Sequence, residues 1–159
     1  MRIIDKMINQ SRLKSPWIIH FDCGSCNGCD IEVLACLTPI YDVERFGVVN
    51  TGNPKHADVL LVTGTVNHRN QHVLKQLYAQ MPEPKAVVAI GACCLSGGVF
   101  KDSYNVLAGA HTVIPVDVFV PGCPPKPEAI IDGVVTALDV VKAKLGVAPM
   151  PQPMLMEND

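Results

Sequence analysis

Cysteine is the residue type in this sequence with the clearest capacity for chemistry. The seven cysteines of the 159-residue chain are Cys23, Cys26, Cys29, Cys36, Cys93, Cys94 and Cys123. Such a number indicates metal ligation or redox chemistry when the compartment keeps thiols reduced, because disulfides are then rare. Four thiolates brought together from separate segments can hold a zinc ion or an iron–sulfur cluster.

The spacing of the cysteines alone leaves zinc and iron–sulfur both open. Structural zinc usually recruits two paired Cys-x₂-Cys knuckles in a small module, whereas here such a pair would be joined by two widely separated single cysteines. Glycines also crowd the same segments, where they let backbone N–H groups approach the sulfurs of a cluster. They are Gly24, Gly28, Gly91, Gly97, Gly98 and Gly122. The residues therefore favour an iron–sulfur cluster.

Short apolar runs predict the strands that would position the cysteines. These runs lie at 15–21, 46–49, 58–64, 85–91 and 113–120. Helices are predicted over 30–37, 67–80 and 126–145. Continuous Val, Ile and Leu runs separated by helices are typical of a parallel sheet that is covered on both faces. The pattern predicts a doubly wound α/β domain.

Most of the cysteines follow a predicted strand, and this placement brings them to one edge of the sheet. Cys23, Cys26 and Cys29 follow the first strand, Cys93 and Cys94 follow the strand at 85–91, and Cys123 follows the last strand. In open α/β sheets, ligands bind in the crevice beyond the carboxyl ends of the strands. Cys36 is the one cysteine placed inside a predicted helix, and it is expected to be a small buried hydrophobe.

Charge and hydropathy exclude several classes of partner and location. The chain has 13 Lys and Arg against 15 Asp and Glu, so no basic field points to nucleic acid. A membrane-spanning helix needs roughly 20 mostly apolar residues, and no such run is found. The N-terminus does not resemble an export signal, so the chain is expected in the cytoplasm. The predicted organisation is a docking helix or arm at 1–14, a domain at 15–146 and an extended tail at 147–159.

Three segments of the sequence resemble one family of electron-transfer subunits. They are Cys26-Asn27-Gly28-Cys29-Asp30-Ile31-Glu32, Gly91-Ala92-Cys93-Cys94-Leu95-Ser96-Gly97-Gly98, and the run from Pro115 to Pro125 that contains Cys123. Over residues 16–145 the chain resembles the small subunit of membrane-bound, energy-converting [NiFe] hydrogenases. The same superfamily includes the 20-kDa-type cluster subunit of respiratory complex I, in which a cysteine would stand at the position of Gly28. That departure favours the hydrogenase branch.

The resemblance implies a flavodoxin-like fold and one [4Fe–4S] cluster held by Cys26, Cys29, Cys93 and Cys123. Spacing does not rank Cys23-x₂-Cys26 against Cys26-x₂-Cys29, but the resemblance does, and it implies that Cys23 is not a ligand. The implied partners are a large subunit with a nickel–iron site, a ferredoxin-like subunit with two clusters, and integral membrane subunits. This assembly would place the chain peripherally at the cytoplasmic face of the cell membrane.

The implied function is electron relay within a ferredoxin-linked, ion-translocating hydrogenase, with catalysis on the large subunit and none in this chain alone. A first alternative is a complex I-type subunit that passes electrons to quinone. A second is a zinc-stabilised interaction module with no redox role. Asp30 and Glu32 follow the cysteine loop, where acids are expected because the helix dipole favours negative charge in the first turn. The same dipole would favour the thiolate of Cys29.

Overall fold

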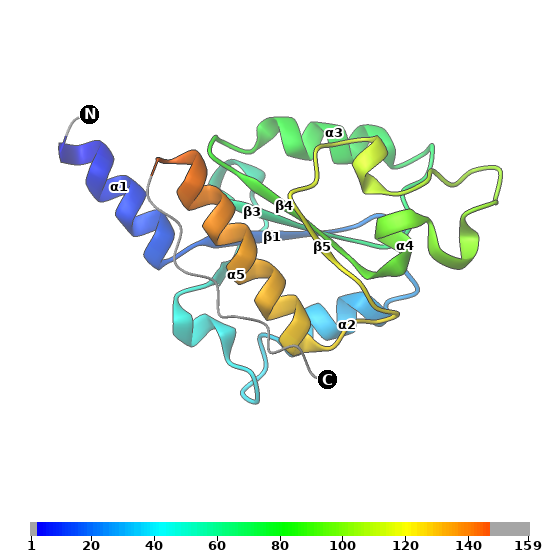
Figure 1. Ribbon diagram of the computed structural model, residues 1–159, viewed down its shortest axis with the longest axis horizontal. Helices are drawn as coiled ribbons and strands as arrows, with labels where there is room; N and C mark the ends of the chain where they lie inside the picture. Colours follow the sequence, from blue (N-terminus) through cyan, green and yellow to red (C-terminus); the bar gives the residue numbers. More distant parts are fainter. Residues whose placement is uncertain (1–2, 147–159) are drawn as a thin grey trace, which may run out of the picture.

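A five-stranded, all-parallel sheet forms the centre of the protein, whose computed structural model describes residues 3–146 (Figure 1). The strands are β1 (Trp17–Asp22), β2 (Val49–Asn50), β3 (Val59–Thr63), β4 (Ala86–Ile90) and β5 (Val118–Val120). They lie in the order β2-β1-β3-β4-β5. This is the flavodoxin-like order of doubly wound sheets, so the predicted fold class is confirmed.

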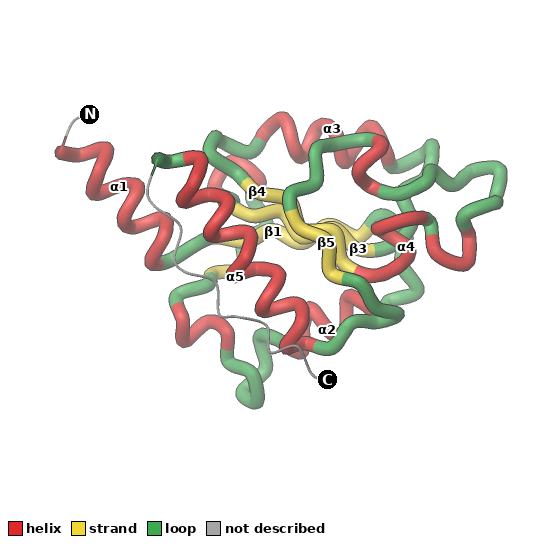
Figure 2. Tube along the Cα trace, in the orientation of Figure 1, coloured by secondary structure: helices red, strands yellow, loops and turns green. Residues whose placement is uncertain are grey.

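Helices cover both faces of the sheet, as Figure 2 shows. They are α1 (Ile3–Lys14), α2 (Gly28–Ala35), α3 (Gln71–Gln80), α4 (Gly91–Ser96) and α5 (Pro127–Lys144). On one face, Val33 of α2 and Ile130 of α5 pack in a core cluster with Leu61 of β3. On the other, Leu74 of α3 and Cys94 of α4 belong to a second cluster. All residues of β3 and β4 are buried, which explains why their sequences are continuous apolar runs.

Three predicted elements differ from those observed. The run at 113–120 forms a strand only over Val118–Val120, because Pro115 has no N–H for a ladder and a short 3-10 helix occupies Ala110–Thr112. The run at 46–49 is shifted to Val49–Asn50 and follows a 3-10 helix over Val43–Phe46. The segment after β4, where no helix was predicted, forms helix α4.

The N-terminal helix α1 is attached to the opposite end of the sheet from α4 (Figure 1). Arg12 Nε donates to Asp58 Oδ1 at 2.6 Å, and Asp58 Oδ2 accepts from the backbone N–H of Trp17. Met7 and Ile8 remain exposed on the helix. Among residues 3–146 no helix is both long and apolar enough to cross a membrane. The predicted tail at 147–159 lies outside the described residues.

Helix α5 approaches strand β5 so closely that only glycine fits at position 133. A Cβ on Gly133 would overlap Val120 Cγ2 and lie 3.6 Å from Val88 Cγ1. Val120 and Val88 are both buried in the core cluster under α5. The contact sets the distance between α5 and the sheet.

We expect Gly133→Ala to lower the free energy of unfolding by about 1–3 kcal/mol, because overpacking outweighs the better helix propensity of alanine. Guanidinium denaturation of the full-length chain followed by circular dichroism measures the change. Gly52→Ala is the matched control, since a Cβ there meets nothing within 4 Å. Equal stability of the two variants would contradict the close contact.

Candidate functional site

Four of the seven cysteines line one cavity at the carboxyl ends of the strands. The cavity has a volume of about 90 Å³. Its lining residues are Ser25, Cys26, Gly28, Cys29, Gly64, Ala92, Cys93, Gly122, Cys123 and Pro124. The structure therefore brings together the four residues that the sequence resemblance names as ligands.

Each of the four thiols comes from a segment that leaves a strand at this edge. Cys26 lies on the turn after β1, and Cys29 lies in the first turn of α2. Cys93 lies in α4, which begins directly where β4 ends, and Cys123 follows β5. Cys26 and Cys123 are exposed at the surface, whereas Cys29 and Cys93 are half-buried. The cavity is thus reachable from solvent along one side.

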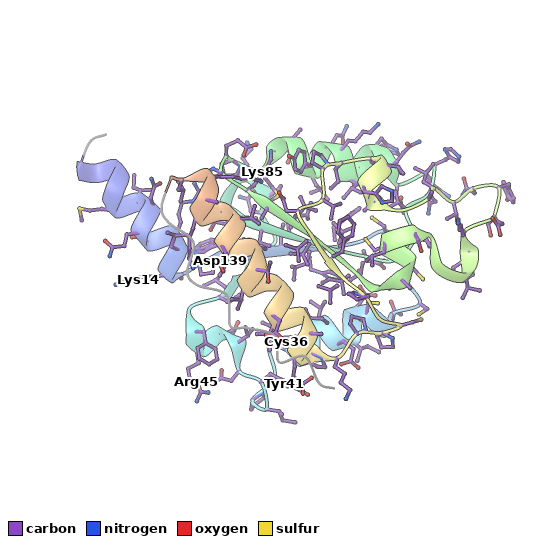
Figure 3. All side chains as sticks on the ribbon, viewed as in Figure 1. Lys14, Cys36, Tyr41, Arg45, Lys85 and Asp139 are labelled. Atoms are coloured by element: carbon purple, nitrogen blue, oxygen red, sulfur yellow. The ribbon has the colours of Figure 1, made fainter. Side chains whose placement is uncertain are left out.

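The other three cysteines lie in the hydrophobic core. Cys23 and Cys94 are fully buried in the cluster beneath α3 and α4. Cys36 is buried between α2 and α5, where its Sγ lies 3.6 Å from the carbonyl oxygen of Pro127 (Figure 3). The prediction of a buried Cys36 is confirmed, but the prediction that it alone lies in a helix is wrong. Cys36 caps the end of α2, while Cys29, Cys93 and Cys94 lie within helices.

A glycine keeps the space beside one of the cavity thiols free. Gly91 has a φ of 84°, which L side chains rarely adopt, and it turns the chain from β4 into α4. A Cβ at this position would lie 2.5 Å from Cys29 Sγ. Any larger residue would therefore displace the Cys29 side chain as well as strain the backbone.

Burial favours the protonated form of the two half-buried thiols of the site, Cys29 and Cys93. Burial, and next the Asp30 carboxylate, raise the pKa of Cys29 to about 11. The pKa of Cys93 is raised by burial and by the nearby Cys123 and Cys26. The expected stabilisation of a Cys29 thiolate by the helix dipole is therefore outweighed by desolvation. A metal group that binds here must displace protons, so its affinity rises with pH.

The arrangement of the thiols distinguishes between kinds of metal group. Within residues 3–146, no three His, Cys, Asp or Glu side chains lie close enough together to hold one ion. The four thiols instead surround a cavity. Tetrahedral zinc needs its sulfurs about 2.3 Å from a single point, whereas a [4Fe–4S] cluster takes four cysteine ligands around a larger body. Four cysteine thiols around one cavity are the donor set that a [4Fe–4S] cluster takes.

The turn that carries Cys26 is held by residues that sequence reasoning did not single out. Asp22 Oδ1 accepts from the backbone N–H of Gly24 at 2.7 Å and of Ser25 at 2.6 Å. Thr65 Oγ1 donates to the carbonyl oxygen of Gly24 at 3.1 Å, and the Asn70 side chain donates to that of Cys23. An Asp two residues before a Gly is a turn signal that could have identified Asp22.

Two larger hollows elsewhere on the protein contain no cysteine. One, of about 430 Å³, lies beside α1 and is lined by residues that include Arg12, Trp17 and Asp58. The other, of about 480 Å³, lies over β1 and α3. The convergence of thiols, and not the size of the hollow, therefore identifies the candidate metal centre.

Comparison with known proteins places the chain among subunits of oxidoreductase complexes. It is 58% identical over 126 residues to the probable membrane-bound hydrogenase subunit mbhJ of Pyrococcus furiosus, covering 79% of this chain and 75% of that protein. It is 44% identical over 157 residues to an NADH-quinone oxidoreductase subunit of Rubrobacter xylanophilus, covering 98% of this chain and 61% of the relative, which is thus considerably longer.

A solved structure and a family match agree with these relatives. A chain of the membrane-bound sulfane sulfur reductase, an archaeal respiratory membrane complex, superposes with a TM-score of 0.75 at 36% identity, covering 89% of this chain and 78% of that one. Residues 26–137 match the family described as NADH ubiquinone oxidoreductase, 20 Kd subunit. The resemblance inferred from the cysteine segments is confirmed, and the chain belongs to this 20 Kd subunit family.

Proposed function

We propose that this chain is an electron-relay subunit of a membrane-associated oxidoreductase complex, and that Cys26, Cys29, Cys93 and Cys123 hold one [4Fe–4S] cluster. The observation that carries the proposal is the shared cavity of these four thiols, from which the buried Cys23, Cys36 and Cys94 are separated. When bound, such a cluster takes up and releases one electron at a time.

The chain's own residues would bind and orient the cluster and limit its contact with water. The half-buried Cys29 and Cys93 form the inner side of the site, while Cys26 and Cys123 lie at its exposed edge. A bound cluster would therefore lie against the protein core on the side of Cys29 and Cys93, and Cys26 and Cys123 would hold it at the surface, where a partner can approach. At that edge it would supply electron exchange with a cofactor on the partner.

Within this class we favour the hydrogenase branch. The 58% identity to a probable membrane-bound hydrogenase subunit supports it, as does glycine at position 28. The partners would be a nickel–iron large subunit, a ferredoxin-like two-cluster subunit and integral membrane subunits. The chain would then be peripheral at the cytoplasmic face of the membrane, coupling ferredoxin chemistry to ion translocation.

A complex I-type relay to quinone is the second candidate. The relative that supports it is the NADH-quinone oxidoreductase subunit of Rubrobacter xylanophilus, whose similarity extends over 98% of this chain. A zinc-stabilised module without a redox role is less favoured, because the relatives are subunits of oxidoreductases. The two redox candidates share the cluster and differ in the partner that exchanges electrons with it.

The ligand assignment predicts which cysteines are needed for iron. Single replacement of Cys26, Cys29, Cys93 or Cys123 by alanine should abolish or convert a cluster of about four iron atoms per chain, because no other thiol lines the cavity. Iron analysis and electron paramagnetic resonance of anaerobically prepared protein measure the loss. Cys23→Ala and Cys94→Ala are matched controls that should retain iron, since both thiols are buried in the core.

A different result would assign the ligand pair to Cys23 and Cys26. That result is loss of the cluster in Cys23→Ala together with a normal spectrum in Cys29→Ala. A small decrease in the stability of the core variants is expected in any case, because each leaves a cavity.

The geometry also predicts that a thiol at position 28 can replace Cys26. A Cβ on Gly28 would lie 3.5 Å from Cys26 Sγ and 3.9 Å from Pro124 Cβ, an ordinary contact. Cys26→Ala combined with Gly28→Cys should therefore recover the iron content that Cys26→Ala loses. Cys26→Ala with Gly28→Ala, which adds the Cβ without the sulfur, should not recover it. If the variant that combines Cys26→Ala with Gly28→Cys folds but holds no iron, the geometry is contradicted.

The functional proposal predicts activity only in the assembled complex. The purified chain should neither consume nor evolve hydrogen, whereas the complex isolated intact from membranes should evolve hydrogen from reduced ferredoxin. The Cys93→Ala complex should lose this activity while retaining nickel, because the electron path is cut and the catalytic site is not. Nickel-dependent turnover by the isolated chain would exclude a relay role, and quinone reduction by a nickel-free complex would favour the second candidate.

A further inference from the structure

A cluster of polar side chains lies directly beneath the turn that carries Cys26 and Cys29. We call it the Asp30 cluster; its members are His20 of β1, Ser25 of the turn, Asp30 of α2 and Thr63 of β3. Thr63 is fully buried, and the side chains of Asp30 and His20 are 14% and 22% exposed. A carboxylate so far removed from water needs hydrogen-bond donors to offset its desolvation.

One oxygen of Asp30 is tied to two neighbouring strands. Thr63 Oγ1 donates to Asp30 Oδ1 at 2.5 Å. His20 Nε2 lies 2.9 Å from both Asp30 Oδ1 and Thr63 Oγ1. A carboxylate only accepts hydrogen bonds, so Thr63 Oγ1 donates to Asp30, and His20 donates to it in the tautomer that carries a hydrogen on Nε2. Strands β1 and β3 are paired along their length, so this oxygen is fixed to the centre of the sheet.

The other oxygen of Asp30 reaches the turn itself. Ser25 Oγ donates to Asp30 Oδ2 and accepts from the backbone N–H of Asn27 at 2.9 Å. Asn27 lies between the two cysteines with a φ of 67°, and it begins α2 without a capping hydrogen bond from its side chain. The Ser25 hydroxyl therefore connects the Asn27 peptide to the carboxylate, and through it to the sheet.

We propose that Asp30 is the positioning residue of the Cys26–Cys29 turn, holding it in the ligand-binding shape before any metal arrives. The proposal rests on the function proposed above, because it assumes that these two thiols are ligands. An acid in the first turn of a helix is otherwise explained by the helix dipole, which acts through charge and needs no defined geometry. Asp30 differs from that case because both of its oxygens have donors from other segments.

Two conservative variants separate geometry from charge. Asp30→Asn keeps an oxygen for Thr63 and His20, and its amide nitrogen can donate to Ser25, so the turn should stay in place. Asp30→Glu keeps the charge but moves the carboxylate by one methylene, so the turn should be released. Asp132→Asn, an equal charge change on the exposed side of α5, is the control.

The measurement is made first on the metal-free full-length chain. Amide hydrogen exchange of Asn27 should be accelerated in Asp30→Ala and Asp30→Glu, and should stay close to wild type in Asp30→Asn and Asp132→Asn. In the iron-loaded chain, release of the cluster to a chelator should be about 10–100-fold faster in the first two variants, the range found for outer-shell partners of metal ligands. Ser25→Ala removes the hydroxyl that connects Asn27 to Asp30 Oδ2 but keeps Asp30 itself, and it should give the same result.

The results that would overturn the proposal differ from those that would overturn the cluster. If Asp30→Glu behaves like wild type while Asp30→Asn shows faster amide exchange at Asn27 and faster release of the cluster, the effect of Asp30 comes from its charge. Wild-type amide exchange at Asn27 in Ser25→Ala would show that the Ser25 hydroxyl does not hold the turn in place. A wild-type chain that binds no iron would refute the proposed function, while the exchange of Asn27 in the metal-free chain would still decide the role of Asp30.

Discussion

The parallel register of the sheet is the constraint on which the rest of the structure depends. β1 pairs with β3 from Ile18 and Val59 to Asp22 and Thr63, and β3 and β4 continue the same direction. Because every strand points the same way, the segments that leave them meet at one edge. Thiols that are far apart in the sequence are therefore brought to one cavity by backbone pairing.

This convergence carries an electrostatic cost that shapes the site. Burial and mutual proximity raise the pKa values of Cys29 and Cys93, so their thiolates are disfavoured without positive charge beside them. The iron of the proposed cluster would supply that charge as protons leave. Cys94 illustrates the opposite outcome: burial raises its pKa to about 12, and it remains an inert part of the core beside a ligand position.

Sequence patterns were sufficient for the features that depend on burial or on chain order. β3 and β4 are covered on both faces, so their apolar runs allowed few other interpretations. The strand ends correctly brought Cys26, Cys29, Cys93 and Cys123 to one edge, but they did not show that Cys23 and Cys94 turn into the core. Helix α4 was missed because six residues are too short to show helical periodicity and its start depends on the backbone of Gly91. The Asp30 cluster was missed because contact between His20 and Thr63 depends on strand register.

The two ends of the sheet are stabilised by different kinds of interaction. At the amino end, Arg12 pairs with Asp58, and Lys144 lies 3.0 Å from Asp117, whose other oxygen accepts from the backbone N–H of Val87. The residues that line the cavity at the carboxyl end include no lysine or arginine. A cation there would lower the pKa of the thiols and pair with them in the free protein. Because the lysine and arginine pairs lie at the amino end of the sheet, the thiols at the carboxyl end remain free to bind a metal group. The hydroxyl donors Ser25 and Thr63 shape the turn without pairing with the sulfurs.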